Sequence, residues 1–162
     1  MIKVFDDFFE ENIRSEIYNL LLRPKWSFSA GREGRRFWHM GDLHNEDYFS
    51  NYVFNLICQK LNKDFKINRI YANGQTAGQC GNPHYDDGDA TLLYYPNPNW
   101  NLEDQGHLVF LENDNEVSRI VTYKSNRAVF FDSKVKHYAD APHRLYSDLR
   151  ISLAYKLLIK NP

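Results

Sequence analysis

From Phe65 onward, short apolar runs alternate with turn-forming segments. The apolar runs that read as strands are residues 91–95, 107–111, 117–123, 128–131, 135–138 and 149–158. Clusters of Pro, Asn, Asp and Ser separate several of these runs, which is typical of turns. At least six short strands after a more helical first third predict a β-sandwich, jelly roll or small barrel with helices on one outer face.

The first 64 residues read as helices and a loop. Apolar residues recur at helical spacing over residues 10–22, and Asp7 and Glu10 have the spacing of a capping box. A second amphipathic helix is predicted over residues 48–61, where apolar residues are spaced by four. Residues 29–39 mix glycines, arginines and aromatics without a period, which predicts a loop or ribbon at the surface.

Length and charge narrow the class of protein further. The chain has 162 residues, so we expect one domain, with residues 1–64 as helical support and residues 65–162 as the β core. The net charge of −1 argues against a partner that is nucleic acid or an anionic membrane. Two cysteines and the absence of a long apolar run predict an intracellular, cytoplasmic protein with reduced thiols and no membrane span.

The last long strand is the most informative. Apolar residues at 149, 151, 153 and 155 alternate with Arg150, Ser152, Ala154 and Lys156. Because side chains alternate between the two faces of a strand, Arg150 and Ser152 point the same way. That face meets either solvent or the interior of the fold, and a polar interior would form a pocket.

His84 and Asp86 are two residues apart, so an extended segment places an imidazole and a carboxylate on one face. With 21 acidic residues among 162, six histidines produce such a pair by chance, and His44 with Glu46 is a second example. Context favours the first pair, because His84 lies between a glycine-containing segment and an apolar strand. His44 lies instead in a polar stretch before a helix.

A third ligand is available downstream. His137 lies in a strand-like segment of the β region. Two histidines and one carboxylate on a β scaffold, with open coordination positions, form the facial triad of non-haem iron(II) oxygenases. Arg150, on the polar face of the last strand, offers a planar fork for a carboxylate cosubstrate.

Residues 71–155 resemble the iron(II)- and 2-oxoglutarate-dependent dioxygenases of the prolyl 4-hydroxylase type. The motifs in family order are His84-x-Asp86, residues 94–100, residues 105–110, residues 131–133 before His137, and Arg150-x-Ser152. Residues 105–108 read Gln-Gly-His-Leu where family members often have Gly-Gly-Glu-Leu, a departure that concerns turn geometry. The resemblance implies an α+β, mainly β fold, a double-stranded β-helix of the jelly-roll or cupin-like type, with N-terminal helices on the outer face of the major sheet.

The resemblance also implies a ligand set. His84, Asp86 and His137 would hold Fe(II), and Arg150 would pair with the distal carboxylate of the cosubstrate 2-oxoglutarate. The alternative role for Arg150 is a surface ion pair.

Three further residues would contact the cosubstrate if the resemblance holds. Tyr71 and Tyr95 would hydrogen-bond 2-oxoglutarate, and Ser152, on the same face as Arg150, is a further contact. Packing is the alternative role of the two tyrosines.

Four other residues attract attention but are given lesser roles. His143 follows a proline and reads as a turn residue, with replacement of His137 as the alternative. His107 is expected at the rim of the fold, and Asp87 in solvent or as support for the ligands. Cys80 is a loop thiol without an identified base.

The activity that the resemblance implies is hydroxylation of a C–H bond, with O2 as second cosubstrate, release of succinate and carbon dioxide, and ascorbate as a possible accessory. A prolyl residue of a protein or peptide is the expected substrate, and residues 31–39 with Trp100 are a candidate aromatic and cationic groove for it. Three alternatives stay open: a free amino acid or other small molecule, an alkylated nucleic acid, and a jelly-roll binding module without catalysis.

Overall fold

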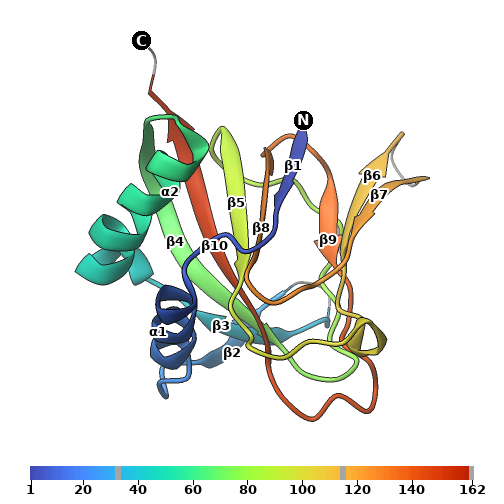
Figure 1. Cartoon of the computed structure of the whole chain (residues 1–162). Helices are drawn as coiled ribbons and strands as arrows, with labels where there is room; N and C mark the ends of the chain where they lie inside the picture. Colours follow the sequence, from blue (N-terminus) through green and yellow to red (C-terminus); the bar gives the residue numbers. More distant parts are fainter. Residues whose placement is uncertain (32–33, 114–115, 161–162) are drawn as a thin grey trace.

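The chain folds into two facing antiparallel sheets (Figure 1). The computed structural model describes residues 1–31, 34–113 and 116–160. Within these ranges, a seven-stranded sheet has the order β1-β8-β5-β10-β4-β3-β2 and a three-stranded sheet has the order β7-β6-β9. The strands are β1 Ile2–Phe5, β2 Ser27–Ala30, β3 Phe37–Met40, β4 Phe65–Gln75, β5 Ala90–Tyr95, β6 Leu108–Glu112, β7 Glu116–Val121, β8 Arg127–Asp132, β9 His137–Ala139 and β10 Arg150–Ile159.

The helices cover the outer face of the larger sheet, on the side away from β6, β7 and β9 (Figure 1). Helix α1 spans Glu11–Leu21, and helix α2 spans Phe54–Leu61 after a π-helical segment, Tyr48–Val53. Short 3-10 turns lie at Leu43–Asn45 and Leu102–Asp104. The mainly β architecture with outer helices confirms the predicted jelly-roll class and both predicted helices. No helix among the described residues is long and apolar enough to cross a membrane.

The first 64 residues also contribute three strands, which the expectation of helices and a loop missed. β1 pairs with β8, and the β2–β3 hairpin extends the sheet beyond β4. Each of these strands has four residues, so their sequences carry little periodicity, and pairing with distant strands decides their conformation. Both ends of the predicted loop over residues 29–39 therefore lie in the strands of a hairpin, at residues 29–30 and 37–39, and residues 32 and 33 lie outside the described residues.

The start of α1 differs from the predicted capping box. Glu10 is the N-cap residue and makes no side-chain capping hydrogen bond, while Asp7 has a φ of 49°. Asn126 holds this turn instead, because its side chain accepts from the Phe9 amide (3.1 Å) and donates to the Phe9 carbonyl (2.7 Å). The Phe8 amide donates to the Asn126 carbonyl (2.9 Å). A contact across so much of the chain leaves no local pattern in the sequence.

Strand β10 separates two environments. Leu153 and Tyr155 are buried in the core shared with the helices. Arg150, Ser152 and Lys156, on the other face, are also buried, with Arg150 and Lys156 each 1% exposed. The polar face of this strand therefore meets the interior between the sheets, where a polar pocket can form.

Asp6 links the end of β1 to the start of β8, and its replacement by Asn is expected to give a pH-dependent loss of stability. The Arg127 guanidinium (2.7 Å), with help from Lys124 (3.0 Å), holds the pKa of Asp6 at about 2. A lowered carboxyl pKa stabilises the fold above its unfolded value near 3.8, and this contribution is lost as the pH falls from about 4 towards 2. Asp6 is 39% exposed, so after solvent screening we expect Asp6→Asn to cost only about 0.5–1 kcal/mol at pH 7.

Urea unfolding of wild type and Asp6→Asn at pH 7 and at pH 2 measures this difference. Asp7→Asn is the matched control, because Asp7 makes no ion pair with a described residue. An equal loss at both pH values, or the same loss in the control, would contradict the ion-pair explanation.

Candidate metal centre

His84 and His137 are held side by side by backbone pairing. Each amide donates to the carbonyl of the other residue at 3.0 Å, so a short antiparallel bridge joins the segment before β5 to the first residue of β9. The imidazole centroids are 4.5 Å apart. The Asp86 amide donates to the Ser133 carbonyl (3.0 Å), which brings its carboxylate to the same place. Ligand atoms of His84, Asp86 and His137 lie within 4.8 Å of one another.

Both imidazoles present an unprotonated nitrogen to this point. The Nδ1 atom of His84 lies 2.8 Å from the Asn82 carbonyl, and that of His137 lies 2.8 Å from the Val135 carbonyl. A carbonyl only accepts hydrogen bonds, so Nδ1 carries the proton and the Nε2 lone pair faces Asp86, at 3.3 Å for His84 and 3.4 Å for His137. Burial lowers the pKa of His137 to about 4, so this ring is neutral at pH 7. Two imidazole nitrogens and a carboxylate suit a divalent metal ion.

The third member, Asp86, is anionic and firmly held. Its side chain is 3% exposed, and its Oδ2 atom accepts from the Thr91 hydroxyl (2.7 Å). The Lys156 ammonium forms an ion pair with the same oxygen. Burial pushes the pKa of Asp86 upward, but the positive charge and hydrogen bond of Lys156 act against it, and the pKa stays well below its usual range. The carboxylate therefore keeps its charge for a cation.

Lys156 and Thr91 received no role in the sequence analysis. They are opposite each other in the β10–β5 register, and the Lys156 ammonium donates to the Thr91 hydroxyl (3.2 Å). The signal was available in the alternation of β10, which puts Lys156 on the same face as Arg150. Thr91 could not be identified in this way, because its neighbours in β5 are apolar.

Arg150 is buried in the space between the sheets without a carboxylate partner among the described residues. Its guanidinium donates to the Gly106 carbonyl (2.7 Å) and to the Gln75 side chain (2.8 Å). Gly106 has a φ of 69°, and a Cβ atom there would lie 2.8 Å from the Arg150 side chain, so this turn needs glycine. The turn that departs from the family pattern thus positions Arg150. A buried guanidinium with neutral partners suits an anion.

Aromatic rings line the space around Arg150. Its guanidinium lies 4.8 Å from the centre of the Tyr123 ring and 5.5 Å from that of Tyr95. The Tyr95 hydroxyl is buried and has no hydrogen-bond partner among the described atoms. Such a hydroxyl is costly unless a ligand pairs with it, and a carboxylate on Arg150 would supply the acceptor. Tyr123 and Gln75 were not singled out in the sequence.

Tyr71 lies near the candidate metal ligands, beside Lys156. Its ring centre is 5.7 Å from the Lys156 ammonium and 5.0 Å from the Arg69 guanidinium. In the β10–β4 register Tyr71 is opposite Ala154, two residues from Ser152 and two from Lys156. Ser152 is buried on the same inner face.

The remaining candidates lie elsewhere. Among the described residues, the His84, Asp86 and His137 group includes neither His44 nor His143. His143 lies in a turn, where its amide donates to the Asp104 carbonyl (2.9 Å), and Glu46, the partner of His44 in the second motif, pairs with Arg23.

Four residues complete this account. His107 precedes β6 and has a buried Nδ1 atom without a partner among the described residues. Asp87 pairs with Arg69 (2.6 Å) at the surface. Burial raises the pKa of the Cys80 thiol, which makes it a poor nucleophile. Trp100 packs on Tyr123, whereas the described residues Gly31 and Phe37 line a cavity beside His84 that does not include Trp100.

A cavity of about 560 Å³ opens onto the metal centre. His84 and Asp86 lie in its wall, together with aromatic residues from β3 and β4, Phe37 and Tyr71. The His84 side chain is 47% exposed, whereas that of His137 is 4% exposed. A reactant can therefore reach the three ligands from the His84 side.

Comparison with known proteins identifies a family. Residues 65–155, more than half of the chain, match the family described as the 2OG-Fe(II) oxygenase superfamily. No curated protein matches the chain.

Three solved structures illustrate the similarity of fold. A Pseudomonas putida prolyl-4-hydroxylase is 16% identical with a TM-score of 0.69, over 99% of this chain and 93% of that one. A Trichoplax adhaerens prolyl hydroxylase, in complex with a peptide fragment of the hypoxia inducible factor, is 20% identical with a TM-score of 0.67, over 97% and 83%. HygX from Streptomyces hygroscopicus, with nickel, 2-oxoglutarate and hygromycin B bound, is 11% identical with a TM-score of 0.73, over 98% and 83%.

Proposed function

Because this chain belongs to the 2OG-Fe(II) oxygenase superfamily, a family of dioxygenases that use iron and 2-oxoglutarate, we propose that it hydroxylates a prolyl residue in a protein or peptide. The reaction consumes O2 and 2-oxoglutarate and releases succinate and carbon dioxide. The observation that carries the proposal is the meeting of His84, Asp86 and His137 at one point, in a fold that also buries Arg150 between its two sheets.

His84, Asp86 and His137 hold the iron in this proposal. Iron bound there would activate O2 for attack on the C–H bond, and the protein supplies the position of the reactants. Three protein ligands would leave other coordination positions of the metal free for cosubstrates. Asp86 acts as a charged ligand rather than as a base, and the backbone bridge between the histidines keeps both Nε2 atoms aimed at the metal.

Arg150 binds the distal carboxylate of 2-oxoglutarate in the same proposal, and the Tyr95 hydroxyl donates to it. This pairing would give a carboxylate to the buried Arg150 guanidinium and an acceptor to the buried Tyr95 hydroxyl, which otherwise lack these partners among the described residues. Tyr71 and Ser152 are assigned as further contacts of the cosubstrate, because both lie on the inner face between Arg150 and the metal ligands.

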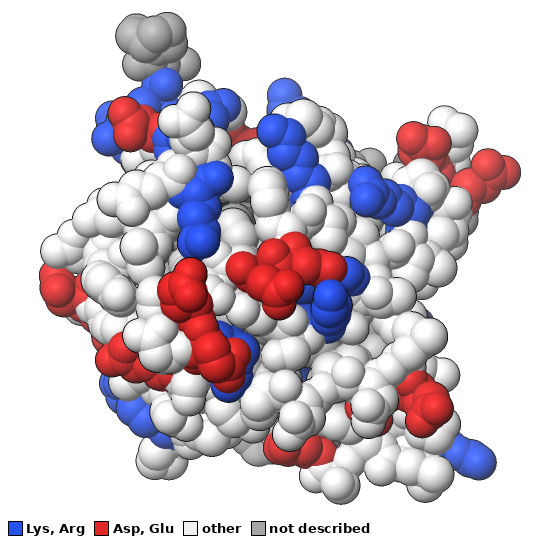
Figure 2. Space-filling view, in the orientation of Figure 1, with Lys and Arg blue, Asp and Glu red and all other residues white. Residues whose placement is uncertain are grey.

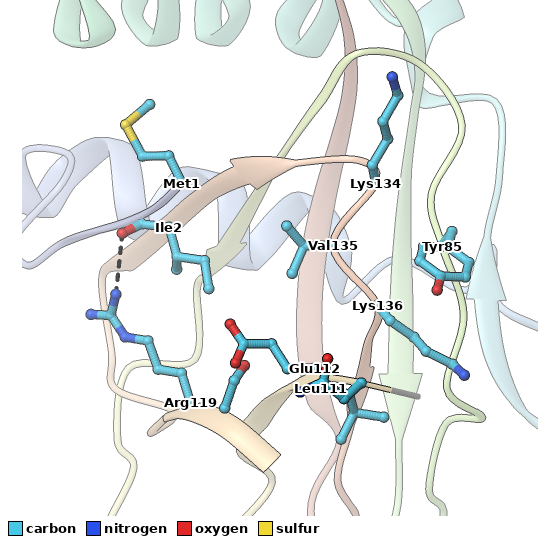
Figure 3. Close-up of a pocket in the computed structure, with 11 residues that line it drawn as sticks. Met1, Ile2, Tyr85, Leu111, Glu112, Arg119, Lys134, Val135 and Lys136 are labelled. Carbon is cyan, nitrogen blue, oxygen red and sulfur yellow. Dashed lines mark hydrogen bonds between the residues drawn. The ribbon is translucent and has the colours of Figure 1, made fainter. Parts of the chain in front are cut away.

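The surface around the metal centre favours an extended substrate. The cavity beside His84 adjoins a second pocket of about 480 Å³, and the two share Tyr85 and Lys136. Figure 3 shows these two residues on one side of the second pocket and Arg119 on the other side, where the Arg119 guanidinium donates a hydrogen bond to the Ile2 carbonyl. A peptide can place its reacting residue near His84 while the adjacent residues of the same peptide occupy the second pocket. A free amino acid is too small to span both pockets.

Two of the alternatives have specific observations for or against them. HygX shares the fold and binds hygromycin B, so a small-molecule substrate remains the second candidate. Nucleic acid is less favoured, because Lys and Arg are interspersed with Asp and Glu over the face in Figure 2 and the net charge is −1.

Proline-containing peptides are expected to raise succinate production above the level seen without substrate and to gain one oxygen atom each. The matched control replaces the single proline of each peptide by alanine. Mass spectrometry of the peptide and succinate release are measured together with Fe(II) and 2-oxoglutarate. Succinate release that no proline peptide stimulates, with no oxygen gained by any peptide, would reject the prolyl substrate and leave the oxygenase itself intact.

A further inference from the structure

Given the proposed role of Asp86 as an iron ligand, on which this inference rests, we propose that Lys156 makes metal binding depend on 2-oxoglutarate. Its ammonium weakens the binding of a divalent cation to the free protein, and the dianionic cosubstrate offsets this repulsion. Lys156 is thus a positioning residue of the site whose main effect is electrostatic.

Lys156 is built into the site by the fold. It is 1% exposed, and its neighbours in the register are Thr91 on β5 and Arg69 on β4. Its ammonium contacts the Asp86 carboxylate and the Thr91 hydroxyl, and lies over the Tyr71 ring. A lysine is rarely buried so fully.

A divalent metal ion bound beside Lys156 would leave an excess of positive charge in this part of the interior. Asp86 is its buried anionic partner, and the more distant Asp87 is already paired with Arg69 at the surface. A divalent ion bound by the same carboxylate would lie close to the ammonium, in an interior where repulsion is little screened. Arg150, which is also buried on this face of β10, is a second cation in the interior. A cosubstrate of charge −2 that binds in this interior therefore offsets the excess positive charge that a metal ion would add.

Orientation and charge can be separated in this site. Lys156 and Thr91 both bind Oδ2 of Asp86, which leaves Oδ1 towards His84. Both residues orient the carboxylate, but only Lys156 adds positive charge. If Lys156 only oriented Asp86, its loss would weaken metal binding as the loss of Thr91 does.

Mn(II) binding to the purified protein, measured by electron paramagnetic resonance, tests the proposal. Lys156→Met removes the charge and keeps an unbranched side chain of similar size, so we expect it to bind Mn(II) about tenfold more tightly than wild type without 2-oxoglutarate. Thr91→Val is expected to weaken Mn(II) binding by about tenfold, as is usual when a partner of a metal ligand is lost. Lys66→Met, at an exposed lysine of β4, is the control and should match wild type.

Adding 2-oxoglutarate gives the second readout. It should tighten Mn(II) binding by a larger factor in wild type than in Lys156→Met, and Mn(II) should likewise tighten 2-oxoglutarate binding more in wild type.

Because Lys156→Met leaves Asp86 without its cation, thermal unfolding of each variant is followed with and without Mn(II), and Lys156→Gln serves as a second neutral variant. Mn(II) should raise the unfolding temperature of both neutral variants more than that of wild type.

Weaker or unchanged Mn(II) binding in Lys156→Met and Lys156→Gln would overturn the electrostatic role while leaving the metal site intact. Failure of wild type to bind Mn(II) at all would overturn the assignment of the three ligands, and this inference with it.

Discussion

Replacing Asp86 with Ala is expected to reduce succinate production to the level of metal-free protein. In the proposed site the substitution removes the charged ligand, and the two imidazoles alone would hold Fe(II) poorly. Fe(II) retained after gel filtration and succinate released with 2-oxoglutarate are the measurements. Succinate production near the wild-type level would contradict the ligand role of Asp86.

The same substitution has a structural consequence that must be controlled. Without Asp86, the Lys156 ammonium is buried without an anion, which costs about 3–5 kcal/mol of stability when one partner of a buried pair is lost. The double variant Asp86→Ala, Lys156→Met removes both charges and should unfold at a higher urea concentration than Asp86→Ala alone. It should still produce no succinate, which separates loss of the ligand from loss of the fold.

Replacing Arg150 with Met is expected to weaken 2-oxoglutarate binding by about a hundredfold or more, since truncation of one partner of a buried charge pair costs 2–5 kcal/mol. Mn(II) binding without the cosubstrate should remain, because Arg150 contacts Gly106 and Gln75 and none of the three proposed ligands. Isothermal titration with 2-oxoglutarate in the presence of Mn(II) measures the effect. The rise in unfolding temperature that 2-oxoglutarate gives the wild type should disappear in the variant.

Tyr95→Phe is the matched control for this experiment. It removes the buried hydroxyl that has no partner and keeps the ring beside Arg150. A loss in 2-oxoglutarate affinity much smaller than that of Arg150→Met is expected, because one neutral hydrogen bond contributes about 0.5–1.5 kcal/mol. Wild-type affinity in Arg150→Met would show that the cosubstrate carboxylate binds elsewhere.

The elements that carry their own periodicity could be predicted from the sequence. The alternation in β10 places Arg150 on a polar face, and the spacing of apolar residues predicts both helices. The ordered motifs around His84, His137 and Arg150 then suggest the family, which the match over residues 65–155 shows. The roles of the individual residues stay proposals, although the structure brings the three expected ligands together.

What could not be predicted depends on contacts between distant segments. β1 has four residues and becomes a strand because β8 offers it an edge. The turn before α1 is held by Asn126 from the far part of the chain, so the local capping pattern at Asp7 was wrong. Lys156 was visible on the inner face, but only the folded chain shows that its ammonium meets Asp86.

The most direct test of the central claim is an anaerobic titration of the wild-type protein with Fe(II) and 2-oxoglutarate, followed by visible absorption. A weak charge-transfer band should appear only when both are present, and it should be absent in the double variant Asp86→Ala, Lys156→Met. Absence of the band in well-folded wild-type protein, or an equal band in the double variant, would contradict an iron centre built from His84, Asp86 and His137.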